Sequence, residues 1–161
     1  MKNYIMIFLT GIPFGIIFFF LIWFRSGLAA GLIVGAIIAA VIGIAGTAFY
    51  HSQKVEFRKS SPLHTGGQNI VMDGPCNHFV GKEGVGGWMY LTEREIIFVS
   101  HNINYNVHSL NILLDSITDI SFYNALGFVP NGMSVTTQAG KVEKFVLYDR
   151  KKWARAIQKG A

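Results

Sequence analysis

Two long apolar runs at the N-terminus constrain this chain more than any other feature. Residues 4–24 carry no charged side chain, residues 26–50 carry none either, and Arg25 separates them. A helix of about 21 residues is about 31 Å long, which matches a hydrocarbon core of roughly 30 Å. Because backbone groups in lipid need partners within the protein, two helices joined by a tight turn are expected. The sequence therefore predicts a transmembrane hairpin over residues 1–50, with spans at about 4–24 and 27–50.

The alternative for the first run is a cleaved secretory signal. Such signals have an apolar core of about 7–15 residues, followed by a small-x-small cleavage site. Small residues do occur at 28–31, but the preceding run is longer than that core and a second apolar run follows at once. A retained span is therefore favoured.

The second run carries a stripe of small residues, spaced four apart, that we call the small-residue stripe. It consists of Gly27, Gly31, Gly35, Ala39 and Gly43. Small side chains let another helix approach closely, which is how membrane helices gain packing in lipid. The first run offers Gly11 and Gly15 around Pro13, where we expect a kink. Two arrangements remain open: the stripe packs on the first helix of the same chain, or it packs on a second copy or a partner membrane protein.

Basic residues near the span ends predict the topology. Lys2 precedes the first span, Lys54, Arg58 and Lys59 follow the second, and the connecting turn has only Arg25. The positive-inside rule then places both termini in the cytoplasm, in a multi-pass protein of the cell (plasma or inner) membrane. The single cysteine agrees with a reducing compartment, because it cannot form a disulfide framework within the chain.

Beyond a polar juxtamembrane linker at residues 51–66, the pattern changes to short strands rich in β-branched and aromatic residues. The expected strands are at 88–91, 96–99, 112–114, 117–123, 133–137 and 141–148. Six or seven closely spaced strands are typical of a small barrel or sandwich. A helix follows after Asp149, with Trp153, Ala156 and Ile157 on one face, and Trp153 is expected to plug one end of the barrel.

Residues 72–157 resemble the GRAM domain, a member of the pleckstrin-homology-like (PH-like) superfold. The resemblance rests on Gly87–Thr92 followed by Ile96–Phe98, on Ile112–Ile120, and on the last strand and helix, in the motifs Gly140-Lys141, Phe145-Val146, Arg150 and Trp153. It implies a membrane α-hairpin plus an α+β, mainly β, PH-like small barrel capped by one C-terminal helix, over residues 67–159. A hairpin before such a domain looks like small bacterial membrane proteins with GRAM or bacterial PH-like modules. The resemblance implies a binding module without catalytic residues to transfer, and it leaves lipids, peptides and proteins open as ligands.

Motifs for catalysis or for a bound cofactor are absent from the sequence. It has no Gly-x-Ser-x-Gly, His-Glu-x-x-His, Walker loop or Cys-x-x-Cys. Cys76, His78, His101 and His108 are residue types that zinc accepts, but their spacing matches no standard zinc module. We therefore expect neither an enzyme nor a metal or cofactor site.

Two basic clusters are the better functional candidates. The first is Lys54, Arg58 and Lys59 beside the membrane, and the second is Arg150, Lys151, Lys152 and Arg155 in the last helix. Cations near an anionic leaflet are worth about 1 kcal/mol each. The first cluster is also explained as a topology signal, and the second as a solvated helix face. Nucleic acid is not expected as a partner, because few aromatic residues are interleaved with these cations.

Two functions follow from these observations. In the first, a membrane-anchored GRAM/PH-like module recruits or regulates a protein partner at the cytoplasmic face. In the alternative, the same domain binds anionic lipid headgroups. The first is preferred at this level, because the hairpin already localises the chain and lipid affinity is not needed for that purpose.

Overall fold

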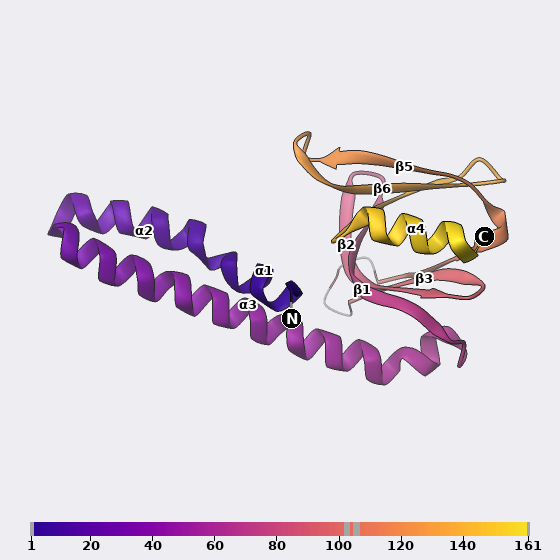
Figure 1. Ribbon diagram of the computed structural model, residues 1–161, viewed down its shortest axis with the longest axis horizontal. Coiled ribbons are helices and arrows are strands. Elements are labelled where there is room, and N and C mark those ends of the chain that lie inside the picture. Colours follow the sequence, from indigo (N-terminus) through magenta and orange to yellow (C-terminus); the bar gives the residue numbers. More distant parts are fainter. Residues whose placement is uncertain (1, 102–103, 105–106, 161) are drawn as a thin grey trace. The chain divides into compact units, whose positions relative to one another are not determined.

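The computed structural model describes residues 2–101, 104 and 107–160. The chain forms two compact units, Met1–Arg58 and Lys59–Ala161. Figure 1 shows the helices of the first unit and the curled sheet of the second. The two units are described separately below.

Three helices account for the first unit, the third of them continuing beyond it: α1 (Lys2–Leu9), α2 (Gly11–Ser26) and α3 (Leu28–Thr65). The break between α1 and α2 falls at Thr10, whose N–H donates to the Ile7 carbonyl at 3.1 Å. It lies three residues before Pro13, whose ring has no N–H to continue the α-helical hydrogen bonds. The kink expected around Pro13 thus takes the form of a short interruption in the first helix.

Two helical segments, Tyr4–Ser26 and Leu28–Thr65, are long and apolar enough to cross a membrane by length and composition. Many of their large apolar side chains are exposed, including Leu21, Phe24, Leu32, Ile33 and Val41. An apolar surface of this extent is costly in water and is accommodated in lipid.

Helix α3 does not end at Tyr50, where the second span was expected to end. It runs on to Thr65, so residues 51–65 of the expected linker are helical. The helix stops at Gly66 and Gly67, which both adopt positive φ, 58° and 77°. Hydropathy marks where lipid contact can end, whereas a helix ends where residues such as glycine favour another conformation.

The small-residue stripe contacts the first two helices of the same chain. A Cβ added at Gly35 would lie 2.7 Å from the Gly15 carbonyl oxygen, and one at Gly15 would lie 2.6 Å from the Gly35 oxygen. Added at Gly31 and Gly43, a Cβ would meet the carbonyl oxygens of Phe19 and Phe8 at 2.8 Å and 2.6 Å. Such distances leave no room for a side chain at these positions.

Two members of the stripe have different surroundings. Ala39 lies opposite Gly11 and Gly15. Gly27 has no atom within 4 Å of an added Cβ and adopts φ 88°. It therefore serves the turn between α2 and α3, where its conformational freedom is needed, rather than the helix contact.

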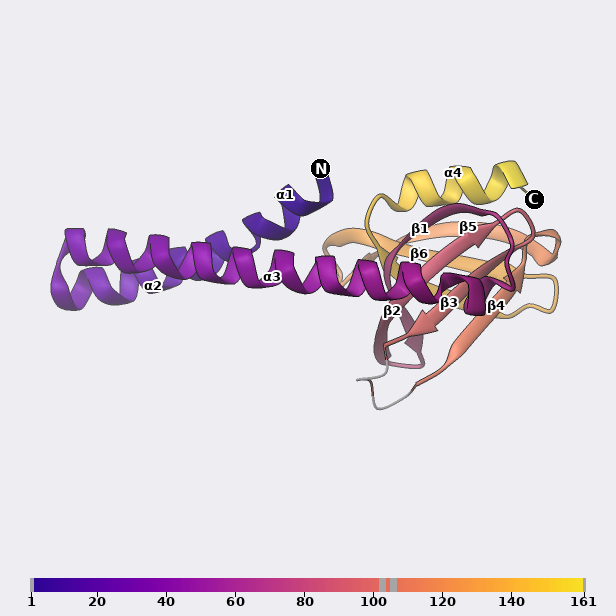
Figure 2. The same cartoon turned by 90° about the horizontal axis from the view of Figure 1, so that it is seen from below.

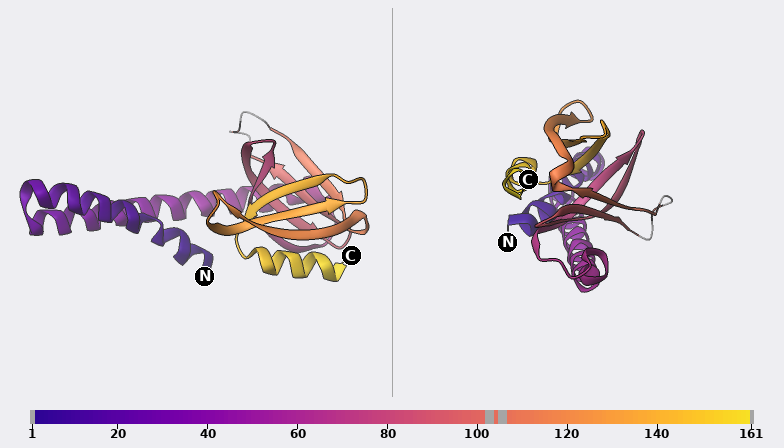
Figure 3. Two further views of the ribbon diagram at one scale, coloured as in Figure 1. Left: turned by 90° about the horizontal axis from the view of Figure 1, so that it is seen from above. Right: turned by 90° about the vertical axis from the view of Figure 1, so that its right-hand side faces the viewer.

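The second unit is built on one seven-stranded antiparallel sheet. Its strands are β1 (Ile70–Val80), β2 (Glu83–Thr92), β3 (Glu95–Ser100), β4 (Ser109–Leu113), β5 (Ile117–Ala125), β6 (Val129–Thr137) and β7 (Val142–Leu147). The spatial order is β4-β3-β2-β1-β7-β6-β5, so β4 and β5 are the edges. Figures 2 and 3 show the sheet curled on itself, as a half-barrel. This architecture, followed by a C-terminal helix, confirms the expected PH-like fold class.

Helix α4 (Arg150–Gly160) lies along one side of the curled sheet and completes its core. Trp153 and Ile157 are 3% and 0% exposed, and they join a cluster that includes Met89, Phe98 and Phe145. Ala154 is more buried than the expected Ala156. The face of α4 predicted from the position of Trp153 is therefore largely confirmed.

Helix contact within one chain predicts that Gly35→Leu disrupts the hairpin. Overpacking costs about 1–3 kcal/mol, and here the added atoms meet backbone, which cannot move aside alone. The matched control is Ala36→Leu, at an exposed neighbouring position. The measurement is energy transfer between fluorophores on Tyr4→Cys and Tyr50→Cys in detergent, since these two rings lie 5.1 Å apart between centroids.

Gly35→Leu should lower the transfer efficiency, and Ala36→Leu should leave it unchanged. Dilution with unlabelled chain is the second control. Transfer that disappears on dilution would mean that the stripe packs between chains instead.

Candidate functional site

Helix α4 presents an exposed row of cations that we call the cationic face: Lys151, Lys152, Arg155 and Lys159. The helix begins after Asp149, whose carbonyl accepts hydrogen bonds from the N–H groups of Lys152 and Trp153 at 2.7 and 3.2 Å. Because Trp153 and Ile157 are fixed in the core, the cations on the rest of the helix circumference face solvent. The contact of Trp153 and Ile157 with the core thus determines which side of the helix carries the exposed cations.

A groove of about 750 Å³ lies between the start of α4 and strands β6 and β7; we call it the α4 groove. Its lining consists of Val129, Pro130, Asn131, Leu147, Tyr148, Asp149, Arg150, Lys151, Lys152 and Arg155. Four of these residues are cationic and Asp149 is the one acidic residue among them. The groove therefore favours an anionic ligand.

Arg150 has a different role from the other cations of the predicted cluster. Its guanidinium donates to the carbonyl oxygens of Tyr123 and Gly132, the latter at 3.1 Å. It also lies 5.1 Å from the centroid of the Phe122 ring. These contacts join the start of α4 to β5 and β6, so Arg150 holds the wall of the groove while Lys151, Lys152 and Arg155 supply its exposed charge.

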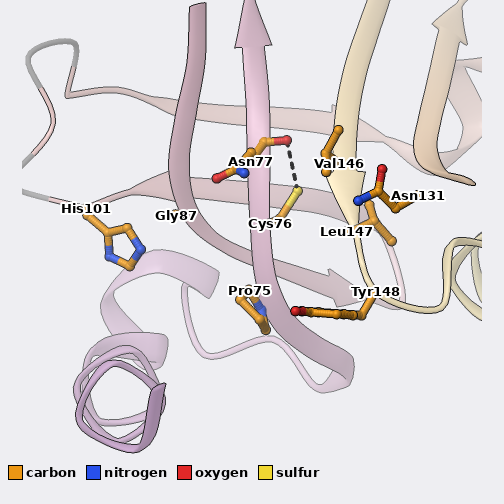
Figure 4. Close-up of a pocket in the computed structure, with 9 residues that line it drawn as sticks. All are labelled: Pro75, Cys76, Asn77, Gly87, His101, Asn131, Val146, Leu147 and Tyr148. Atoms are coloured by element: carbon orange, nitrogen blue, oxygen red, sulfur yellow. Dashed lines mark hydrogen bonds between the residues drawn. The ribbon is translucent and has the colours of Figure 1, made fainter. Parts of the chain in front are cut away.

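A second pocket, of about 270 Å³, adjoins the α4 groove and shares Asn131, Leu147 and Tyr148 with it. Figure 4 shows its lining side chains. The Oδ1 atom of Asn131 is buried and accepts no hydrogen bond from the described part of the chain. Cys76 is 5% exposed and its Sγ donates to the Asn77 carbonyl at 3.5 Å. Burial raises the pKa of this thiol, so Cys76 behaves as a small core residue.

A polar network lies inside the sheet, at positions that are far apart in the sequence. His78 Nε2 lies 2.8 Å from Glu143 Oε2, and His78 Nδ1 lies 2.9 Å from His108 Nε2. Lys141 Nζ lies 2.6 Å from the other Glu143 oxygen. A neutral His78 that donates to Glu143 must accept at Nδ1, so His108 is the donor in that second bond. His78 and Glu143 are both buried.

Burial dominates the electrostatics of His78. It lowers the pKa of this imidazole from its ordinary 6.5, although Glu143 acts in the opposite direction. For Glu143, burial opposes ionisation, but the Lys141 ammonium and His78 together outweigh it and lower the pKa below 4.5. The network therefore consists of a neutral imidazole and an ionised carboxylate held by a lysine.

The structure divides the residues considered as metal ligands in the sequence into two pairs. His78 and His108 contact each other, whereas Cys76 and His101 line the second pocket. Among residues 2–101, 104 and 107–160, no group of three or more His, Cys, Asp or Glu side chains could hold a metal ion. Glu143 was not considered from the sequence, because it lies 65 residues from His78 and no local spacing connects the two.

Lys54, Arg58 and Lys59, which are predicted to lie beside the membrane, belong to helix α3. Lys54 and Arg58 belong to the first unit, and Lys59 begins the second. Lys54 Nζ lies 5.5 Å from the centroid of the Tyr4 ring, on the helix that opens the chain. This cluster is therefore part of a continuous helix, which includes residues 51–65 of the predicted linker.

No family model matches the chain, and no curated protein does. Among solved structures, the C-terminal domain of an unknown protein from Leishmania infantum is 20% identical, with a TM-score of 0.55, over 66% of this chain and 95% of that one. The C-terminal PH domain of human FYVE, RhoGEF and PH domain containing protein 3 is 10% identical, with a TM-score of 0.47, over 57% and 88%. The Slm1 PH domain in complex with phosphoserine is 9% identical, with a TM-score of 0.42, over 56% and 91%. The first of these likenesses supports the fold of the second unit.

The buried network predicts that the second unit loses stability in mild acid. Below about pH 6.5 His78 is protonated in the unfolded chain, whereas burial keeps it neutral in the folded unit. The free energy of unfolding therefore decreases as the pH decreases. Below about pH 4.5 Glu143 adds a further loss of the same sign. Urea unfolding of residues 59–161 at about pH 7, 6 and 5 measures this dependence. His78→Gln should flatten it, and equal slopes for both proteins would contradict the assignment.

Proposed function

We propose that the chain is a membrane-anchored, non-catalytic binding module. Residues 1–50 form a two-span hairpin in the cell membrane with both termini in the cytoplasm, and residues 67–159 form a GRAM/PH-like domain of the kind found in small bacterial membrane proteins. The domain binds anionic lipid headgroups of the leaflet that holds the hairpin. The α4 groove carries this proposal, because three exposed cations surround it on a fixed helix.

Electrostatics favours this ligand class. Three cations at an anionic surface contribute about 3 kcal/mol together, which corresponds to roughly a hundredfold in binding. That is weak for a free domain and sufficient for a tethered one, since the anchor supplies a high effective concentration. Lys54, Arg58 and Lys59 would add to the same attraction at the membrane surface, in addition to setting the topology.

The chemistry of the groove supports binding rather than catalysis. None of its ten lining residues is His, Cys, Ser or Thr, so the groove lacks the hydroxyl or thiol nucleophile and the imidazole of the common catalytic triads. In the buried network, the polar atoms of His78 and Glu143 bond to each other, to His108 and to Lys141. Its arrangement is that of a structural hydrogen-bond network, in which Lys141 pairs with the Glu143 carboxylate.

Recruitment of a protein partner is the second candidate. Among the strands in the described part of the chain, β4 and β5 each pair with a neighbour on one side only. Such edges accept an added strand from another chain. Binding of this kind depends on backbone hydrogen bonds and is largely insensitive to the charge of α4.

Charge reversal distinguishes the two candidates. Lys151→Glu with Arg155→Glu should abolish flotation of residues 59–161 with anionic vesicles, because attraction becomes repulsion. The matched control is Lys82→Glu with Arg94→Glu, two exposed cations outside the groove with the same change of net charge. Cooperative thermal unfolding of each protein verifies that it is folded.

The unmodified unit should float with anionic vesicles, less so at high salt, and not with neutral ones. If both double variants lost flotation equally, vesicle binding would depend on the net charge of the unit alone and not on the α4 groove. Absence of flotation at any salt concentration would exclude lipid binding by this surface.

A further inference from the structure

The turn between β5 and β6 exposes large apolar side chains where turns normally carry polar ones. Leu126 is 84% exposed and Phe128 is 75% exposed. They flank Gly127, and we call these three residues the apolar tip. The tip is the orange turn at the end of β5 in Figure 1. Isolated exposed apolar residues are ordinary, but two large ones at a single protruding turn indicate a contact surface.

The tip is held in a defined conformation. Gly127 N–H donates to the Asn124 carbonyl at 3.2 Å. Leu126 and Gly127 both adopt positive φ, 53° and 82°, which is unfavourable for leucine. The strands below the turn are fixed to α4 by Arg150, through the Tyr123 and Gly132 carbonyls. The apolar side chains therefore project from a braced hairpin.

Strand β6 leads from the tip directly into the α4 groove. Val129, Pro130 and Asn131 directly follow Phe128, and they line the α4 groove together with Lys151, Lys152 and Arg155. Residues 120–142 contain no acidic side chain. Apolar side chains beside a field of cations, with acidic residues largely excluded, complement an anionic bilayer, in which charged headgroups lie directly above acyl chains.

We infer that the apolar tip inserts Leu126 and Phe128 into the boundary between headgroups and acyl chains of an anionic bilayer, while the cationic face contacts the headgroups. This inference rests on the proposed function and adds a depth and an orientation to it. The two contributions differ in kind: the cations provide attraction that salt weakens, and the tip provides apolar burial that salt does not weaken.

The test uses the full-length chain in vesicles, with a fluorophore on Asn124→Cys, an exposed position at the base of the turn. Energy transfer to headgroup-labelled lipid reports the approach of the domain, and quenching by a nitroxide on the acyl chain reports insertion. A second label on Lys82→Cys, in the exposed β1–β2 turn, is the control for non-specific contact. Neutral and anionic vesicles are compared.

In anionic vesicles, the nitroxide should quench the label at position 124 and not the one at 82. Leu126→Ser with Phe128→Ser should reduce the insertion equilibrium by at least about tenfold, since each side chain loses apolar burial. The matched control is Leu113→Ser with Val142→Ser, two exposed apolar residues outside the tip and groove. That control should leave quenching unchanged.

The outcomes separate the two proposals. Approach that depends on anionic lipid without acyl-chain quenching would overturn insertion and leave headgroup binding intact. No dependence of approach on anionic lipid would overturn both. A label shielded from aqueous iodide equally in both vesicle types, without nitroxide quenching, would mean that protein covers the tip, and would overturn insertion as well.

Discussion

Burial of one face of α4 against the curled sheet is the contact on which the rest of the second unit depends. Trp153 and Ile157 occupy the core beside Phe98 and Phe145, so the helix cannot rotate about its axis without exposing them. Loss of a buried tryptophan of this kind costs about 3–5 kcal/mol. Since the apolar face is fixed, the direction of the cationic face and the shape of the α4 groove are fixed with it. Arg150 extends the same constraint to the β5–β6 hairpin.

A second constraint comes from the hairpin of apolar helices. Gly15 and Gly35 approach so closely that no larger side chain fits at either position. If the hairpin anchors the chain in a membrane, as we propose, the second unit needs only weak surface contacts to act there. Three cations and two apolar side chains are adequate for a tethered domain, although they would hold a free one poorly.

Patterns within short stretches of sequence predicted much of this architecture. The uncharged runs indicated both apolar helices, alternation indicated most strands, and the position of Trp153 indicated the buried face of α4. Local patterns did not predict two features: the end of helix α3 and the presence of strand β1. Helix α3 continues through a polar segment to Thr65, and β1, which contains Gly74 and Pro75, had no clear strand pattern.

Contacts between distant residues were beyond sequence reasoning. The sequence grouped Arg150 with its neighbouring cations, but its partners Tyr123 and Gly132 lie 27 and 18 residues away. The network of His78 and Glu143 spans 65 residues and depends on β1 pairing with β7. The apolar tip was also missed, although the sequence offers a signal for it: Leu126 and Phe128 flank a glycine between two expected strands. Its significance needed the structure, in which the residues that follow it line the α4 groove.

The most direct test of this account is amide hydrogen exchange of the full-length chain in nanodiscs of neutral and of anionic lipid. The account predicts slower exchange in anionic discs at residues 126–129 and at the start of α4, with the buried strands β2 and β3 unchanged. Equal exchange in both discs, or protection confined to the edge strands β4 and β5, would contradict lipid docking through this surface.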